Sequence, residues 1–170
     1  MKKLQLTHEI HCSVEHFWEV FFDKGFNTTL YLNELGFPKY EILEQREEGG
    51  KVAYRKTRGT PRADAPAAVK KLMGDGFGYD EEGRFDSSGR LWTFKLKMNT
   101  LADKLRTEGS VRCEAAGPDR CKRIMQMEFE AKIFGVGSII EAFSEGEMKK
   151  GWDQSAAYMN RWVKDHPKAG

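Results

Sequence analysis

The C-terminal part of the chain predicts one long amphipathic helix over residues 138–165. Ser138 is followed by Glu141 at the spacing of a capping box, which is typical of a helix N-terminus. Apolar residues then recur at steps of mostly three and four, so they share one face of the helix. They are Ile140, Phe143, Met148, Trp152, Ala156, Met159 and Val163. A helix of this length extends about 40 Å, so the rest of the chain must supply a long apolar surface to cover the stripe.

The segments before this helix alternate apolar and polar residues with the period of a β-strand. Residues 2–10 form one strand, and hairpin patterns follow over 39–59, 77–99 and 106–134. Their turns are predicted at Gly49-Gly50, Ser87-Ser88-Gly89 and Gly117-Pro118-Asp119. Short helices are predicted after Ser13, from Asn27, and within residues 66–74.

These elements predict an α+β fold in which a curved seven-stranded antiparallel sheet wraps around the long C-terminal helix. Each strand has one apolar face, which favours antiparallel pairing, and the long helix is the only large element that can cover that face. Two short helices follow the first strand. Because no break in composition and no repeat divides the chain, residues 1–170 are expected to form a single domain.

Charge and cysteine content narrow the class of protein. The net charge is +2, from 28 basic and 26 acidic residues, which gives no bulk argument for nucleic-acid binding. The chain has no apolar run of the roughly 18 residues that a membrane span requires, and its start lacks the apolar segment of a signal peptide. The cysteines Cys12, Cys113 and Cys121 have no paired spacing. Reduced thiols in a cytoplasmic protein are the simplest interpretation.

The order of elements resembles the helix-grip fold of the START-like superfamily, also called SRPBCC. This superfamily includes plant pollen-allergen proteins, bacterial polyketide cyclases and START lipid-transfer domains. The resemblance covers nearly the whole chain and is strongest in THEIHCSVEHFWEVFFDKGF and in FEAKIFGVGSIIEAFSEGEMKKGW, where a Gly135/Gly137 corner precedes the long helix. The second stretch is similar to uncharacterised bacterial families of the superfamily and, more distantly, to sterol-binding VASt domains.

The resemblance implies a hydrophobic cavity between the sheet and the long helix that binds a lipid, a sterol or a polyketide-like molecule. Binding, and transfer between membranes, is the function we expect, without a cofactor. The residues predicted to contact the ligand are Tyr54, Phe77, Tyr79, Phe85, Trp92, Phe94, Leu96, Met98, Met125, Met127, Phe129, Ile140, Phe143, Glu147 and Met148. The alternative is that they fill an ordinary core and that the protein is an interaction module. Methionines suit an adaptable lining, which favours the cavity.

Glu147 lies near the apolar stripe of the long helix, next to Gly146. A carboxylate there can orient a ligand hydroxyl, or transfer a proton if its pKa is raised; at the edge of the stripe it is simply solvated. An enzyme of the cyclase or dehydratase type is therefore the second hypothesis. Its candidate acid–base groups are Glu147, Tyr54, Tyr79 and His8.

His8, His11, Cys12 and His16 are residue types that bind zinc. However, the segment passes from a strand into a helix, and His8 and His11 point to opposite faces of the strand. We therefore expect no metal site, and a buried, hydrogen-bonded His8 is the favoured interpretation.

A basic cluster precedes the second hairpin. It consists of Arg55, Lys56, Arg58, Arg62, Lys70 and Lys71, with Asp64 as the acid among them. It is either a solvated strand edge and loop or a rim that contacts anionic lipid headgroups, with residues 59–75 as a lid. Nucleic acid is a poorer partner, because no series of aromatic residues accompanies the basic ones.

Overall fold

The computed structural model describes residues 1–62, 64–86, 88 and 90–168. The strands are β1 (Lys2–Ile10), β2 (Lys39–Glu48), β3 (Lys51–Thr60), β4 (Tyr79–Phe85), β5 (Leu91–Met98), β6 (Leu105–Ala115) and β7 (Cys121–Ala131). The helices are α1 (Val14–Phe21), α2 (Lys24–Thr29), α3 (Ala67–Met73) and α4 (Gly137–Asp165), with a π-helical turn, η1 (Leu30–Glu34), after α2. The predicted order of elements is confirmed.

The strands form one seven-stranded antiparallel sheet in the order β1-β7-β6-β5-β4-β3-β2. β2 to β7 follow one another as a meander, and β1 joins the free edge of β7. Gly49 and Gly50, at φ 60° and 80°, form the tight turn between β2 and β3, a backbone conformation that glycine adopts without steric cost. Of the predicted turn between β4 and β5, residues 87 and 89 lie outside the described residues.

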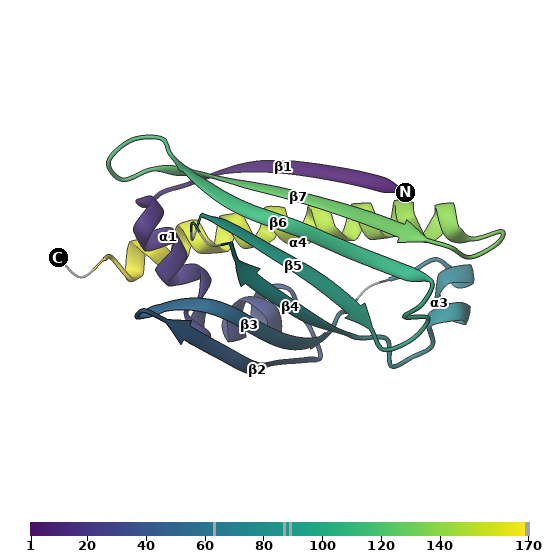
Figure 1. The fold of residues 1–170 in the computed structure, drawn as a ribbon. Helices are drawn as coiled ribbons and strands as arrows, with labels where there is room; N and C mark the ends of the chain where they lie inside the picture. The colour runs from purple at the N-terminus through teal and green to yellow at the C-terminus, as the bar shows by residue number, and fades with distance from the viewer. Residues whose placement is uncertain (63, 87, 89, 169–170) are drawn as a thin grey trace.

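The long helix α4 runs along the apolar face of the curved sheet and contacts β1 and β7 (Figure 1). Its C-terminal half is core: Ala156, Met159 and Val163 are buried. Phe26 of α2 stacks on Tyr158 at a ring-centroid distance of 5.3 Å, which fixes the short helices against this end of α4. None of the described helices is long and apolar enough to cross a membrane.

The helix starts differ in how well the sequence predicted them. Ser13 caps α1 as expected, since its hydroxyl accepts the His16 N–H at 3.2 Å. The second helix begins at Lys24 rather than Asn27, because the Asp23 carboxylate accepts the Phe26 N–H at 2.7 Å and caps it earlier.

The capping box predicted at the start of α4 is absent. The helix begins at Gly137, so Ser138 lies inside it, and no side chain caps the first turn. Glu141 instead accepts the backbone N–H of Ala131 at 3.0 Å. The corner is tight, because a Cβ on Gly137 would lie 2.4 Å from the Ala131 carbonyl oxygen. The close approach of β7 therefore directs the Glu141 carboxylate to the strand end.

Candidate functional site

A cavity of about 480 Å³ lies between α4 and the sheet. Its walls come from η1, α3, the inner faces of β3 to β7 and the cavity-facing side of α4. The predicted ligand contacts that line it are Phe77, Tyr79, Trp92, Phe94, Leu96, Met98, Met127, Phe129, Ile140, Phe143, Glu147 and Met148. The structure thus brings most of the predicted set around one space, and ligand contact itself stays a prediction.

Three predicted residues lie away from the cavity. Met125 is fully buried in the core. Phe85 packs edge-on against Trp18, with ring centroids 4.8 Å apart, beyond the cavity wall. Tyr54 faces the outer side of the sheet, where the guanidinium groups of Arg46 and Arg84 lie 4.2 and 4.6 Å from its ring centroid.

The apolar-face prediction is therefore wrong for Tyr54, and Arg55 takes the inward position on β3. The cross-strand register shows why, because directly paired residues lie on the same face of the sheet. Tyr54 pairs with Arg84 on β4, which pairs with the exposed Thr93 on β5. Arg55 pairs with Gly83 on β4, which pairs with the buried Phe94 on β5. Two arginine side chains cover the Tyr54 ring from outside, so its burial does not require the interior.

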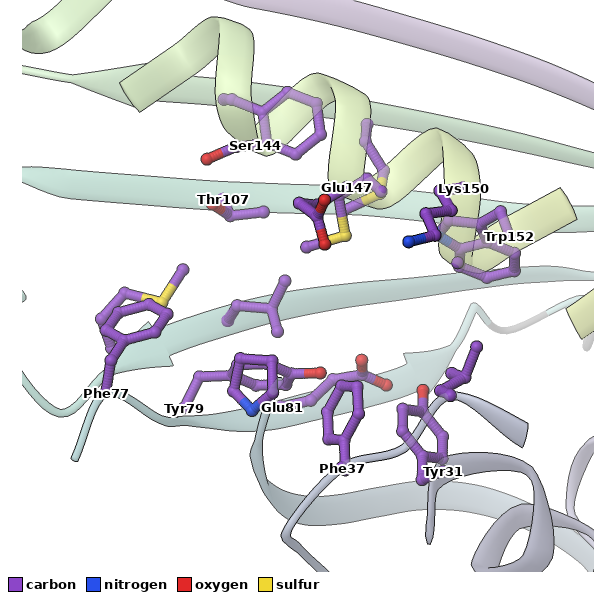
Figure 2. Close-up of a pocket in the computed structure, with 18 of the residues that line it drawn as sticks. Tyr31, Phe37, Phe77, Tyr79, Glu81, Thr107, Ser144, Glu147, Lys150 and Trp152 are labelled. Carbon is purple, nitrogen blue, oxygen red and sulfur yellow. The ribbon is translucent and has the colours of Figure 1, made fainter. Parts of the chain in front are cut away.

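A polar centre lies on the sheet-side wall of the otherwise largely apolar cavity. It comprises Tyr31 from η1 and Tyr79 and Glu81 from β4, whose side-chain oxygens lie in a row facing the cavity (Figure 2). Within the described residues, none of these oxygens forms a hydrogen bond, and the nearest charged partner of Glu81 is Arg55, at 3.9 Å. We call Tyr31, Tyr79 and Glu81 the polar row.

Burial sets the protonation behaviour of the polar row. It raises the pKa of the Glu81 carboxyl, and the positive charge of Arg55 opposes that rise. Burial, together with the nearby Glu81 charge, raises the pKa of Tyr31 and Tyr79, so both phenols stay protonated and can donate a hydrogen bond. The row therefore offers two hydroxyl donors on either side of a carboxyl group.

Arg55 is held inside the protein, so its predicted contact with lipid headgroups is wrong. The side chain is 5% exposed. Its terminal NH1 donates to the Phe21 carbonyl oxygen at 2.8 Å, and the guanidinium lies 4.8 Å from the Phe21 ring centroid. A buried guanidinium in this position sets the electrostatic potential beside Glu81.

The other members of the basic cluster separate into two groups. Arg58 makes two hydrogen bonds to Asp80 on the outer face of the sheet, at 2.7 and 3.0 Å, and Lys56 pairs with Glu82 at 3.3 Å. Arg62 and Lys70 line the cavity near α3, and Lys71 is exposed on that helix. The cluster is therefore not one continuous basic rim.

The opposite wall of the cavity is formed by α4. Ser144, Glu147, Lys150 and Trp152 project from it toward the sheet, across from the polar row (Figure 2). Glu147 thus faces the cavity, as predicted from its helical position. Glu147 on this wall and Glu81 on the sheet thus both face the enclosed space.

A second buried arginine, Arg123 of β7, joins the sheet to α4. Its terminal nitrogens donate to Ser155 Oγ at 3.0 Å and to the Trp152 carbonyl oxygen at 2.8 Å, and one lies 3.1 Å from His8 Nδ1. Burial lowers the pKa of Arg123 to about 10.

His8 belongs to this joint and not to the cavity lining. Its Nε2 lies 2.7 Å from Asp153 Oδ1, and burial lowers the pKa of the imidazole. His8 and Tyr54 therefore do not meet the geometric requirement of the acid–base hypothesis. No group of three or more described His, Cys, Asp or Glu residues is arranged to hold a metal ion, and Cys12, Cys113 and Cys121 are free thiols.

Sequence reasoning did not single out Glu81, Tyr31 or Arg123, and it assigned Arg55 to the basic cluster. For Glu81 a signal existed: Tyr79, Glu81, Gly83 and Phe85 alternate on one face of the strand, and both aromatic residues were assigned to the apolar face. For Tyr31 no periodic signal existed, because it lies in a π-helical turn.

Comparison with known proteins identifies the fold. Residues 5–163 match the model of a family described as "Protein of unknown function (DUF2505)". No curated protein matches the sequence significantly. The solved structures that it resembles include a START superfamily protein, an aromatase/cyclase and norcoclaurine synthase, so the predicted START-like helix-grip fold is confirmed.

Three of these structures show the extent of the likeness. The Zhui aromatase/cyclase from Streptomyces sp. R1128 has a TM-score of 0.68 at 14% identity, covering 99% of this chain and 96% of that chain. Norcoclaurine synthase from Thalictrum flavum, in complex with dopamine and hydroxybenzaldehyde, has a TM-score of 0.65 at 18% identity, covering 99% and 89%. A START superfamily protein from Mycobacterium smegmatis has a TM-score of 0.61 at 14% identity, covering 96% and 97%.

Proposed function

The chain belongs to the DUF2505 family, and we propose that it binds a hydrophobic small molecule, lipid-like or sterol-like, in the cavity between the sheet and α4. The observation that carries this proposal is the polar row, whose three side chains have no hydrogen-bond partner within the described protein although they face an otherwise largely apolar space. Buried polar groups normally have partners. A ligand with an apolar body and one hydrogen-bonding group would satisfy both features of the cavity.

The size of the cavity supports a ligand rather than a packing defect. Its volume of about 480 Å³ lies within the range of roughly 300–1,000 Å³ typical of small-molecule sites. Burial of the apolar body at about 25 cal/mol per Å² supplies the main driving force. The polar row supplies orientation, because the ligand's polar group is directed toward Glu81.

Two further observations agree with this proposal. Two of the structural neighbours are named as an aromatase/cyclase and a synthase crystallised with small aromatic molecules, which supports a small-molecule ligand. The free thiols of Cys12, Cys113 and Cys121 suit a reducing compartment, so we place the protein in the cytoplasm.

The test is native mass spectrometry of the protein purified from its own host, followed by organic extraction of what it releases. We expect a discrete bound mass of a few hundred daltons that disappears on denaturation. In the variant Glu81→Gln the bound fraction should fall, whereas Glu82→Gln, the neighbouring residue on the outer face, should keep it. An apo mass for the wild type, with no uptake from a host lipid extract, would contradict the proposal.

A second candidate function is acid–base catalysis of the cyclase or dehydratase kind in the same cavity. It is favoured by the raised pKa of Glu81 beside the protonated hydroxyl groups of Tyr31 and Tyr79, because a carboxyl that titrates nearer neutral pH can both accept and donate a proton. Once the ligand is identified, the two functions separate. An enzyme with Glu81→Gln binds the substrate and loses turnover, whereas a carrier shows no turnover in either form.

A further inference from the structure

Several of the large apolar side chains exposed on the described surface gather at one end of the molecule. The exposed large apolar residues are Met1, Leu32, Leu43, Leu72, Phe134 and Ile139. Phe134, in the connection between β7 and α4, is fully exposed. Ile139 in the first turn of α4 is 43% exposed, and Leu72 on α3 is 37% exposed. We call Leu72, Phe134 and Ile139 the apolar tip.

The apolar tip lies on two segments that also line the cavity. Lys70 and Met73 of α3 and Ile140 and Ser144 of α4 line that space, so the two segments that carry the tip are also cavity walls. Figure 1 shows α3 and the turn from β7 into α4 at the same end of the molecule, opposite the short helices α1 and α2. The exposed apolar side chains therefore lie on segments that also line this end of the cavity.

We propose that the apolar tip docks on the surface of a lipid bilayer. An aromatic and two aliphatic side chains that project from a helix end and a turn can enter the boundary between headgroups and acyl chains. Lys70 and Lys71 on α3 and Lys104 in the neighbouring loop form no ion pair within the described part of the chain. The Lys132 N–H donates to the Lys104 carbonyl oxygen at 2.9 Å, which places that loop beside the tip.

These lysines favour an anionic bilayer. Their long apolar stems can lie along the membrane surface while the ammonium groups reach the phosphates. Asp75 and Asp103, close in sequence to α3 and Lys104, reduce the net charge of the region. The apolar contacts therefore supply most of the affinity, and the lysines supply the preference for anionic lipid.

The area of the tip argues against a second protein molecule as the occupant. A standard interface buries about 800 Å² on each partner, whereas a fully buried aromatic side chain contributes about 150–250 Å². Three side chains, of which Leu72 and Ile139 are only 37% and 43% exposed, fall well below that area. A bilayer needs no matching surface, since its apolar region accepts protruding side chains individually.

The test is co-sedimentation of the purified protein with vesicles of equimolar phosphatidylcholine and phosphatidylglycerol. We expect the wild type to bind and Phe134→Ser to bind about 10-fold less, as loss of one buried aromatic side chain predicts. Because Phe134 contacts solvent on all sides, folding should be unaffected, which far-UV circular dichroism checks. The matched control is Leu43→Ser, which replaces an apolar side chain of β2 that is 39% exposed. Vesicle binding of this variant should equal that of the wild type.

Three outcomes would overturn the docking proposal. They are no binding of the wild type, equal loss in Phe134→Ser and Leu43→Ser, or self-association in the absence of lipid that Phe134→Ser abolishes. Vesicle binding is measured without added ligand, so its failure is distinct from failure of the proposed function, which mass spectrometry tests.

Discussion

Two arginine side chains from different strands of the sheet are buried beside the same cavity, and their surroundings differ in one respect. Arg123 and Arg55 both lie over aromatic rings, at 4.7 Å from Trp152 and 4.8 Å from Phe21, and both keep an Nε without a partner. Arg123 donates to a hydroxyl and a carbonyl and meets an imidazole nitrogen, all uncharged acceptors of the protein, if His8 is neutral. Arg55 has one carbonyl and a carboxylate 3.9 Å away.

This difference distinguishes an arginine that stabilises the fold, Arg123, from one that belongs to the candidate site, Arg55. The Ser155 hydroxyl and the Trp152 carbonyl carry no charge, and burial keeps His8 neutral by lowering its pKa, so Arg123 is a fixed joint between β7 and α4. Glu81 can respond to a change at Arg55 by binding a proton, and its oxygens remain free for a ligand. A buried charge held by neutral hydrogen-bond acceptors thus stabilises the fold, whereas one beside a carboxylate that forms no hydrogen bond marks the candidate site.

The largest effect is expected when the joint around Arg123 is broken. Arg123→Ala should lower the free energy of unfolding by about 3–5 kcal/mol, because it removes the guanidinium's hydrogen bonds to Ser155 Oγ and to the Trp152 carbonyl oxygen and empties the space over the Trp152 ring. Urea unfolding followed by fluorescence measures this. A loss below about 1 kcal/mol would mean that water replaces the guanidinium and that the joint is not structural.

Arg55→Met should have a smaller effect that depends on pH. We expect a loss of about 1–3 kcal/mol near neutral pH. Arg55 opposes the burial that raises the pKa of Glu81, so its removal raises that pKa further. The folded state then binds more protons than the unfolded state above about pH 4.3, and stability falls as pH rises toward the folded pKa. The loss should therefore be smaller at about pH 5 than at about pH 8.

A second substitution isolates the cause of this pH dependence. If Glu81 is the titrating group, Arg55→Met combined with Glu81→Gln should lose the additional slope of stability against pH. Urea unfolding at several pH values compares the single and the double variant. If the double variant keeps the additional dependence of stability on pH, another group is titrating. In that case the proposed difference between Arg55 and Arg123 would not hold.

Ser155→Ala tests how much of the stability of the Arg123 joint comes from the Ser155 hydroxyl. It removes one acceptor of Arg123 and the hydrogen bond that Ser155 Oγ donates to the Trp152 carbonyl oxygen, at 2.8 Å. The guanidinium keeps that carbonyl and His8, so the loss should be about 1 kcal/mol. Urea unfolding gives the value. A loss as large as that of Arg123→Ala would place the stabilisation in the Ser155 contacts rather than in the arginine.

The difference between the two arginines also shows which features of the fold and of the candidate site the sequence could predict. Alternation and helical periodicity identified the strands and α4, because both follow from which face is apolar. The same logic fails for buried charges: it placed Tyr54 inside and Arg55 outside, and it passed over Glu81 although Tyr79 and Phe85 share its face.

Hydropathy could not indicate the inward position of Arg55. The guanidinium is accommodated by the Phe21 carbonyl and by aromatic rings from α1 and β5, elements distant in sequence. In β2, the register shifts near Leu43 and Arg46 break the alternation that would have linked the two strands of the hairpin. The strands were therefore predictable from local pattern, and the centre of the site required the tertiary arrangement.

The smallest effect is expected at an arginine that has a carboxylate partner in solvent. Arg58→Ala removes two hydrogen bonds to Asp80 on the outer face of the sheet, yet the midpoint of urea unfolding at neutral pH should not change measurably, because exposed ion pairs contribute little. What should change is Asp80 itself. The Arg58 hydrogen bonds hold the pKa of this carboxyl below its usual value, so in the variant the pKa should rise toward normal, as NMR titration of the carboxyl would show. A clear loss of stability in Arg58→Ala would contradict this expectation. It would mean that an exposed arginine with good hydrogen-bond geometry stabilises the fold as a buried one does, so burial would not distinguish Arg55 and Arg123 from the surface arginines.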